Sequence, residues 1–538
     1  MTNKISFWTF LKQVHQIAKP YFQSEQKYKA WGLLFAIVSL NLGSVYLAVL
    51  FNEWYGVFYN ALQEKNATIF WHQMINFSYL AFIAILVAVF RFYLTQVFEI
   101  RWREWMTKQQ LKRWLSHQAF YKWELYKNQV DPIQNTSYDN PDQRITEDIS
   151  GFTSQSVGLT MGLLNSVVTL VSFVGILWGL SGAFSFDIAG YHLNIPGFMV
   201  WAALVYCLVG SVLTHYIGYP LTGLSVAQQK VEANLMHHLM REREYSEAIA
   251  LDKGENTENN LSNLQFSNVI ANYFAYIKAQ KRLIWFTSFF GQAAVIFPFL
   301  VAAPRYFSGA IQLGQVIQIS SAFGKVQDSL SWFIDNYNSL ASWRATTNRL
   351  IDFNNNIERA HAQITQHETS AKPIMLASQL EIQLPNGQTL LSSPHLQLQP
   401  GDSVALIGAS GSGKSSLLRA LAGIWPFRQG TVSMPQNAMF IPQNPYIPNG
   451  TLRAALSYPA SSHQYSDEAL LNALQLVKLD GLKTKLDEEN NWSQQLSGGE
   501  QQRLAIARVF LKKPAWIFAD EATSALDENS QQFYSLEG

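Results

Sequence analysis

The sequence predicts an α-helical membrane domain with six spans, followed by an α/β phosphate-loop domain. Three observations lead to this fold class. Residues 1–340 contain long apolar stretches, and a helix of about 20 apolar residues is enough to cross a bilayer core. Lysines and arginines gather between alternate stretches. A glycine-rich motif at 408–415 follows a short apolar run and precedes a helical pattern, as a phosphate loop requires.

The apolar stretches divide the first part of the chain into spans and connecting segments. We assign 1–29 to an N-terminal segment, whose apolar residues recur at helical spacing and predict an amphipathic helix at the inner interface. The membrane domain is assigned to 30–353, a linker to 354–373 and the phosphate-loop domain to 374–538. The expected spans are 30–51, 76–98, 157–180, 197–219, 283–303 and a more polar 312–335.

The distribution of basic residues predicts the orientation of these spans. Lysine and arginine number five in 1–29, eight in 99–156 and seven in 220–282. The alternate segments 52–75, 181–196 and 304–311 hold one, none and one. By the positive-inside rule, the N-terminus, the two long loops and the phosphate-loop domain lie in the cytoplasm.

Overall composition excludes some classes of protein. The 538 residues carry a formal net charge of only +1, so no global basic field favours nucleic acid as a partner. Cys207 is the single cysteine, which excludes a disulfide within the chain and a cysteine metal cluster.

The glycine-rich motif carries specific phosphate chemistry. The apolar run Val404 to Ile407 predicts a buried strand leading into the loop, and Leu417, Leu418 and Leu421 predict the helix that follows. Backbone N–H groups of such a loop and helix start point at a phosphate. Lys414 would neutralise the outer phosphates and the Ser415 hydroxyl can bind Mg²⁺. The loop residues are Gly408, Ala409, Ser410, Gly411, Ser412, Gly413, Lys414, Ser415 and Ser416.

Two further motifs make this domain resemble the ATPase domain of ABC transporters. Residues 496–503 read Leu-Ser-Gly-Gly-Glu-Gln-Gln-Arg, in which Ser497 and Glu500 also form a capping box at a helix start. Residues 514–527 contain an apolar strand, Trp516 to Ala519, that ends in two carboxylates. With the preceding spans, the resemblance implies the exporter-like type IV fold, with ATP and Mg²⁺ as cofactors.

The resemblance also implies a role for each motif residue. Asp520 would hold Mg²⁺ with Ser415, Glu521 would activate the attacking water, and Gln443 would sense both Mg²⁺ and that water. The signature motif would close on ATP bound to the partner chain; its residues are Leu496, Ser497, Gly498, Gly499 and Glu500. A D-loop would follow at Ser524, Ala525, Leu526 and Asp527.

The sequence departs from the family pattern in two places. An aromatic residue often stacks on adenine upstream of the loop, whereas the corresponding residue here is the aliphatic Leu384, which implies weak base selectivity. The family continues past the D-loop to a further strand and a histidine that contacts the γ-phosphate. This sequence stops at Gly538, and we expect that it is truncated there.

Residues 140–148 predict a capped helix that would couple the two domains. Asn140 can cap, Pro141 suits the first helical position, Asp142 suits the helix dipole and Gln143 completes a box-like pattern. Local chemistry alone supports a capped surface helix. The sequence of residues 140–148 resembles that of one branch of ABC transporters, the peroxisomal fatty-acyl-CoA half-transporters and their SbmA, BacA and YddA-type bacterial relatives. That resemblance, which also covers residues 243–255, implies coupling residues Asn140, Pro141, Asp142, Gln143, Arg144 and Glu247.

A polar stripe runs through the last span. Its members recur at steps of three or four: Gln318, Ser321, Lys325, Asp328, Trp332 and Asp335. Charged residues within spans usually face a bundle interior or water. The stripe predicts either a cavity lining, with Lys325 and Asp328 as pathway residues, or a cytoplasmic helix extension with a solvated face.

These observations predict an ATP-driven transporter in a bacterial inner membrane. The resemblance implies that two chains, most simply identical ones, share two ATP sites; a heterodimer is the alternative partnership. The transported solute would be an acyl-CoA, a fatty acid, a peptide or cobalamin. The competing function is an ATP-gated channel or regulatory membrane protein with weak hydrolysis.

Overall fold

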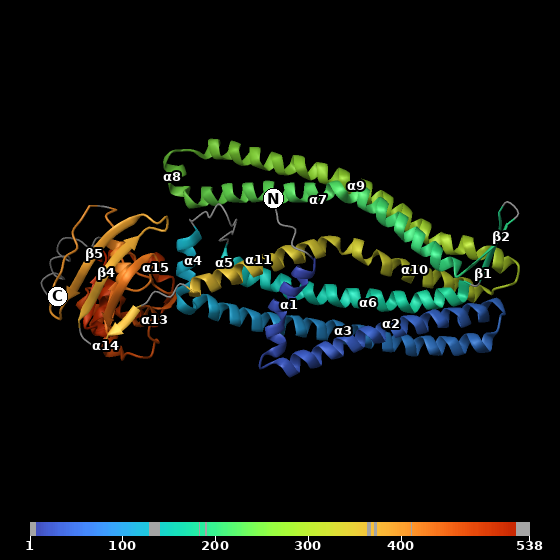
Figure 1. Ribbon diagram of the computed structural model, residues 1–538, viewed down its shortest axis with the longest axis horizontal. Helices are drawn as coiled ribbons and strands as arrows, with labels where there is room; N and C mark the ends of the chain where they lie inside the picture. The colour runs from blue at the N-terminus through green and yellow to red at the C-terminus, as the bar shows by residue number, and fades with distance from the viewer. Residues whose placement is uncertain are drawn as a thin grey trace. The chain divides into compact units, whose positions relative to one another are not determined.

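The computed structural model describes residues 7–127, 140–181, 183–188, 191–362, 367–370, 374–409 and 411–522. The chain divides into two compact units, residues 1–108 with 142–351 and residues 109–141 with 352–538. Helices dominate the first unit, and the second mixes helices with strands (Figure 1).

Long helices build the first unit, and two of them, α3 and α11, continue into the second. A π-helical turn, Arg144–Asp148, joins α5 to α6. The strands β1 (Ala183–Ile188) and β2 (Tyr191–Pro196) pair as an antiparallel hairpin that the sequence analysis did not predict. The helices are α1 Phe7–Gln23, α2 Lys27–Gln63, α3 Ala67–Leu115, α5 Pro141–Gln143, α6 Ile149–Ser181, α7 Phe198–Glu244, α8 Ser246–Leu251, α9 Glu255–Phe307, α10 Leu313–Asp335 and α11 Tyr337–Ala362.

Four predicted spans lie within a helix, and the other two, 197–219 and 312–335, begin at the N-cap residue of one. Five helical segments are long and apolar enough to cross a membrane: α2, Ala67–Tyr126, Pro141–Ser181, α7 and α9. The sixth predicted span forms α10, but it is not among those five, and the predicted count of six therefore exceeds what length and composition support. Most of these helices extend well past their predicted spans into the segments that connect them.

The N-terminal helix α1 covers the membrane domain with its apolar face. Phe10 and Tyr21 are buried, and Tyr21 stacks on Trp102 of α3 with ring centroids 5.8 Å apart. Val14 and Ile17 pack against the same cluster. The predicted N-terminal helix is therefore present, but its apolar face packs against other helices of this unit. A position at the membrane interface stays a prediction.

Helix α2 holds the start of α10 through a close backbone contact. A Cβ at Gly314 would lie 2.0 Å from the Gly56 carbonyl oxygen, so only glycine allows this approach. The Asn60 side-chain oxygen accepts from the Gly314 N–H at 2.8 Å, and Gln63 accepts from Leu313 N–H at 2.7 Å. These bonds satisfy donors that a helix start leaves without intrahelical partners.

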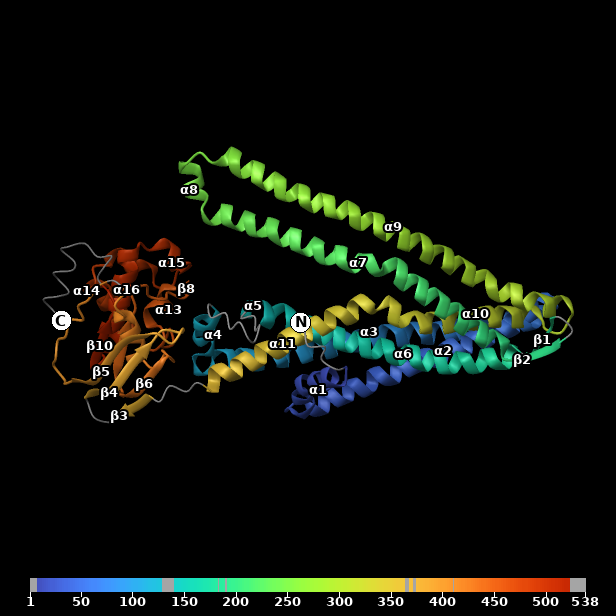
Figure 2. The same ribbon diagram turned by 45° about the horizontal axis from the view of Figure 1, so that its top comes forward.

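Helices α7 and α9 lie side by side as a long hairpin that α8 closes at one end (Figures 1 and 2). Near the β1–β2 end, Tyr206 of α7 stacks on Phe290 of α9 with ring centroids 4.1 Å apart. Toward α8 the hairpin diverges from α3, α6 and α10 (Figure 2). The α8 end is therefore a projecting tip held by contacts between α7 and α9.

The second unit combines a four-stranded sheet and two two-stranded sheets, β7–β10 and β8–β9, with two groups of helices. Strands β3, β6, β4 and β5 are neighbours in that order, and β10 pairs in parallel with β7. The elements are α4 Ala119–Lys127, β3 His367–Ser370, β4 Met375–Gln383, β5 Thr389–Leu398, α12 Lys414–Leu421, β6 Arg428–Pro435, β7 Ala438–Ile441, β8 Gly450–Thr451, α13 Leu452–Ser457, α14 Asp467–Leu476, β9 Glu489–Asn490, α15 Trp492–Gln495, α16 Gly498–Lys512 and β10 Trp516–Ala519, with 3-10 turns at Ser116–Gln118 and Asp480–Lys485.

Two hydrophobic clusters stabilise this unit. One joins α12 to the sheets and includes Leu417, Val432 and Phe518; the other joins α13, α14 and α16 around Trp492. Helix α4 also belongs here, because its Leu125 packs against the first cluster.

Candidate nucleotide site

The phosphate loop ends at a helix start that is open to an anion. Gly411 and Gly413 adopt φ values of 79° and 92°, a region that glycine enters without strain. Gly413 caps α12, which begins at Lys414 as the sequence predicts. The first N–H groups of that helix have no intrahelical partner and favour a negative group. Of the nine predicted loop residues, Ser410 lies outside the described residues.

Lys414 lies over the loop. Its Nζ donates to the carbonyl oxygens of Gly408 at 2.8 Å and Ala409 at 3.0 Å. These bonds hold the ammonium group beside the backbone that would enclose a phosphate. A phosphate oxygen is a stronger, charged acceptor for the same group.

The parallel pairing of β7 with β10 brings four predicted site residues into two hydrogen-bonded pairs. Ile441 stands opposite Ala519, so the segments after these two strands leave the sheet at the same edge. The Ser415 hydroxyl donates to Asp520 Oδ1 at 3.0 Å. Gln443 Nε2 donates to Glu521 Oε2 at 2.8 Å. A triphosphate at the helix start would therefore meet a hydroxyl, two carboxylates and an amide.

The backbone fixes the direction of Glu521. Its φ of 49° is in the left-handed region, which non-glycine residues seldom occupy. Asp520 donates its N–H to the Ile441 carbonyl at 2.9 Å, and the rings of Phe440 and Phe518 stack at 4.8 Å. These contacts hold Glu521 in a backbone conformation that is unfavourable for a residue other than glycine. Such strained residues cluster at functional sites.

Gln502 also supports this site, and the sequence analysis missed it. Its side chain is buried, and Nε2 donates to the Gln443 carbonyl at 3.3 Å. Gln502 lies two residues past Glu500 in the signature string, so its position in that string could have marked it.

The prediction of a buried strand at Val404 to Ile407 is wrong. The segment has no strand conformation, and Val404 and Ile407 expose 64% and 93% of their surface. An apolar run becomes a buried strand only where neighbouring strands pair with it. Among the described residues, no strand pairs with 404–407.

The signature motif forms the predicted capping box. Ser497 caps α16 and accepts from the Glu500 N–H, while Glu500 Oε2 accepts from the Ser497 N–H at 2.9 Å. Hydrogen bonds from the backbone and hydroxyl of Ser497 hold the pKa of Glu500 below its usual value. Gly498 and Gly499 form the first turn, where no side chain obstructs the backbone N–H groups. Leu496 is buried beneath them.

A buried arginine fixes α16 in the domain. Arg508 Nη2 donates to the Tyr446 carbonyl at 2.9 Å, and Nε donates to the Ala455 carbonyl at 3.0 Å. Burial lowers the pKa of Arg508 to about 10. The sequence analysis missed this residue, because its partners are distant in the chain and no local pattern marks them.

The structure places the predicted coupling residues Pro141 to Arg144 in one long helical segment. Residues 141–148 run directly into α6 and do not form a separate helix. Gln143 Nε2 donates to Glu147 Oε2 at 2.9 Å. The box-like pattern with Asn140 stays a prediction. Asn140, Asp142 and Gln143 are exposed, as is Glu247 in the first turn of α8.

An ionic network lies immediately after these residues. Arg144 Nη1 is 2.6 Å from Asp148 Oδ2, and both side chains are buried. Arg349 of α11 adds two bonds to the same carboxylate, of 2.5 and 2.9 Å. The network ties the start of α6 to α11, which the sequence analysis did not foresee.

The members of the polar stripe of α10 lie in different surroundings. The side chain of Gln318 lies against Gly56 of α2, and Trp332 lies against Gly162 of α6. Lys325 and Asp328 are exposed. In the described parts of the chain no ion pair joins them, although their spacing would allow one. The predicted D-loop, Ser524 to Asp527, lies outside the described residues.

Comparisons with known proteins match both units. A family model described as ABC transporter transmembrane region 2 matches residues 17–307, and the ABC transporter model matches 391–524. An uncharacterized ABC transporter ATP-binding protein of Haemophilus influenzae is 35% identical over 97% of this chain and 87% of its own length. The inner membrane ABC transporter ATP-binding protein YddA of Escherichia coli is 31% identical, over 95% and 90%.

A solved structure gives the same picture of the fold. A bacterial Atm1-family ABC exporter with ATP bound superimposes with a TM-score of 0.68, covering 95% of this chain and 88% of that one. The sequence identity is 16%, so this likeness concerns the fold alone.

Proposed function

Because the chain belongs to the ABC transporter family, we propose that it works as a half-transporter whose two identical copies share two ATP sites. The chain is an ATP-driven membrane transporter with a membrane domain and an ATPase domain. One chain carries both a phosphate loop and a signature motif, so two identical chains supply every part of both sites.

In each site, residues of one chain bind the phosphates and its carboxylates assist hydrolysis. Lys414 leaves the loop carbonyls to bind the outer phosphates, and Glu521 accepts a proton from the attacking water. Gln443 positions Glu521 through the bond between them. One observation supports this assignment above all. The Gln443–Glu521 pair and the Ser415–Asp520 pair lie next to each other at one edge of the β7–β10 sheet.

The same edge suits Mg²⁺, which prefers oxygen ligands and keeps several waters. The Ser415 hydroxyl and the Asp520 carboxylate lie 3.0 Å apart and supply such oxygens, with the Gln443 amide nearby. When bound, the ion would neutralise charge on the phosphates. Asp520 would hold it, and Ser415 would turn its hydroxyl from Asp520 toward it.

The partner chain completes each site through its signature motif. Ser497 and the N–H groups of Gly498 and Gly499 contact the γ-phosphate, because the start of α16 favours an anion. The Ser497–Glu500 capping box keeps that helix start preformed. Ser524 to Asp527 would form the D-loop next to the same phosphate.

The membrane domain has six spans, with α10 as the sixth, and both chain ends lie in the cytoplasm. The charge distribution supports this orientation, because basic residues gather in alternate segments. Residues 140–144 and Glu247 contact the ATPase domains and couple hydrolysis to movement of the spans. Lys325 and Asp328 line the path of the solute, which is an acyl-CoA, a fatty acid, a peptide or cobalamin.

Two substitutions test the division of labour in the site. Glu521→Gln should bind ATP and remain closed without steady-state hydrolysis, whereas Lys414→Ala should lose ATP binding. Nucleotide binding and phosphate release are measured on the purified chain in nanodiscs. Glu468→Gln, which removes an exposed carboxylate from α14, is the control and should behave as the parent does. Hydrolysis by Glu521→Gln at the parental rate would refute the role of Glu521.

A further inference from the structure

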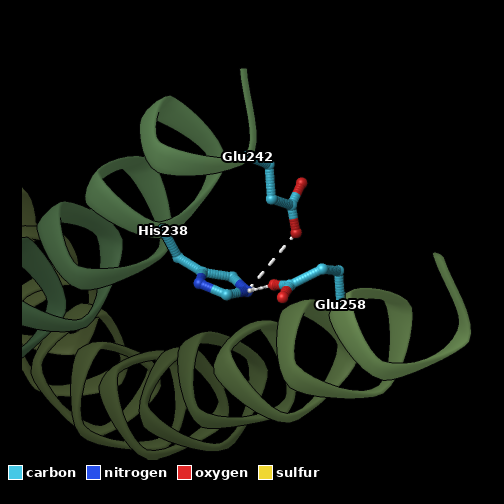
Figure 3. A group of neighbouring side chains, drawn as sticks. All are labelled: His238, Glu242 and Glu258. Carbon is cyan, nitrogen blue, oxygen red and sulfur yellow. Dashed lines mark ion pairs between the residues drawn. The ribbon is translucent and has the colours of Figure 1, made fainter. Parts of the chain in front are cut away.

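The tip of the α7–α9 hairpin holds a histidine facing two glutamates. His238 and Glu242 stand one turn apart on α7, and Glu258 faces them from α9 (Figure 3). His238 Nε2 lies 3.3 Å from Glu242 Oε1 and 3.5 Å from Glu258 Oε2. One atom from each of the three residues lies within 4.8 Å of the others. Three ligand-type atoms from two helices therefore converge on one point.

These distances match the edges of a small coordination tetrahedron. Zinc binds imidazole nitrogen and carboxylate oxygen at about 2.0–2.2 Å. Two such ligands at the tetrahedral angle are separated by about 3.3–3.5 Å, which follows from those bond lengths. Both distances from His238 Nε2 fall in that range. The two carboxylate oxygens lie within 4.8 Å of each other, so a bound ion would draw them together.

The burial of the imidazole nitrogen adds to this indication. His238 Nε2 is closed off from solvent, and the Glu242 and Glu258 oxygens beside it are not in hydrogen-bonding geometry with it. Buried polar atoms seldom remain without a partner, and an exception calls for an explanation such as an ion. The nitrogen points at both carboxylates (Figure 3). A cation bound there would satisfy it.

The surroundings are those of a metal site with an open position. A hollow of about 410 Å³ adjoins the cluster and is lined by both glutamates, by residues of α8 and by Ser262. It has room for a water molecule as a fourth ligand. The Ser262 hydroxyl donates to Glu242 Oε1 at 2.6 Å, which fixes the direction of that carboxylate. Such outer hydrogen bonds orient metal ligands.

We propose that His238, Glu242 and Glu258 bind a divalent transition-metal cation of the Zn²⁺ class, with water as the fourth ligand. The imidazole selects against Mg²⁺ and Ca²⁺, which take oxygen ligands. The ion joins α7 to α9 one turn before the segment that leads into α8. It thereby stabilises the projecting tip of the hairpin. This inference does not depend on the proposed function.

Metal binding to the purified full chain tests the site. The chain is freed of any histidine tag, kept in nanodiscs and titrated with Zn²⁺ against a chromophoric chelator. We expect one ion per chain. His238→Ala and Glu258→Gln should each lower the affinity by at least about tenfold, since each removes a ligand. His237→Ala removes the neighbouring, exposed histidine and should bind as the parent does.

A spectroscopic and a thermal measurement complete the test. Co²⁺ in place of Zn²⁺ should give the visible absorption of a four-coordinate ion in the parent and in His237→Ala, and not in Glu258→Gln. Zn²⁺ should raise the thermal midpoint of the parent and leave that of Glu258→Gln unchanged. The proposal is overturned if the parent binds no more Zn²⁺ than His238→Ala and Glu258→Gln, or if His237→Ala loses the same affinity.

Discussion

The ionic network at the start of α6 gives the sharpest prediction about stability. Asp148→Asn would remove the carboxylate charge beside the Arg144 guanidinium, and only 6% of the Arg144 side chain is exposed. Breaking a buried ion pair on one side costs about 3–5 kcal/mol, because the remaining charge stays desolvated. Arg349 is 42% exposed and can turn to water, so it adds little to that cost.

A set of variants separates these contributions. We expect the free energy of unfolding to fall most in Asp148→Asn, by about 3–5 kcal/mol. Arg349→Met should cost about 0–1 kcal/mol, because an exposed ion pair contributes little. Adding Arg144→Met to Asp148→Asn should recover most of the loss, since it removes the buried positive charge that Asp148 had balanced. Sodium dodecyl sulfate titration in mixed micelles measures the unfolding, with intrinsic tryptophan fluorescence as the probe.

Two results would count against this reasoning. One is an Arg349→Met loss equal to that of Asp148→Asn, which would mean that Arg349 and not burial of Arg144 controls the network. The other is a double variant no more stable than Asp148→Asn, which would mean that the buried charge of Arg144 is not the source of the cost.

Three further predictions concern packing, coupling and the pathway. Gly314→Ala should destabilise the membrane domain by about 1–3 kcal/mol through its clash with the Gly56 carbonyl, while Gly324→Ala, with open space around it, should not; equal thermal midpoints would contradict this. Ile145→Pro should uncouple ATPase activity from the solute while ATP affinity stays near the parental value, because proline breaks a helix interior at a cost of about 3 kcal/mol. In a Cys207→Ala background, cysteines at Ser321, Lys325 and Asp328 should show thiol labelling that changes with ATP, whereas the buried Val326→Cys stays unreactive. Labelling at these three positions that is indifferent to ATP would favour a solvated helix extension.

Much of the fold follows from local sequence patterns. The helices that contain the predicted spans, and α12, α16 and β10, appear where the apolar periodicity and capping residues predict them, because these signals act within one or two helical turns. The β1–β2 hairpin was not predicted, although Phe184, Phe186 and Ile188 alternate with other residues along β1.

The predictions that were wrong or missing concern contacts between residues far apart in the sequence. Val404 to Ile407 looks like a buried strand, but burial depends on neighbours that the run itself does not specify. The partners Asp148 and Arg349 are 201 residues apart, and no local pattern joins them. The i,i+4 spacing of His238 and Glu242 is visible in the sequence, whereas Glu258 becomes a third ligand only once α9 folds back on α7.

Within the site, the motifs predicted which residues meet but not how they are held. Ser415 with Asp520 and Gln443 with Glu521 form pairs that the order of motifs suggests. The supports, Gln502 and Arg508, act through backbone carbonyls, which every residue type offers. No residue identity in the sequence therefore marks those contacts.

Solute transport against a gradient tests the central claim most directly. The purified chain is reconstituted in liposomes with Mg²⁺ and ATP, and accumulation of labelled acyl-CoA, fatty acid, peptide or cobalamin is followed in separate samples. We predict that one solute class accumulates beyond its equilibrium level with the parent, and not with Glu521→Gln. Movement that stops at equilibrium for every solute, in the parent and in Glu521→Gln alike, would contradict ATP-driven transport and indicate an ATP-gated passive path.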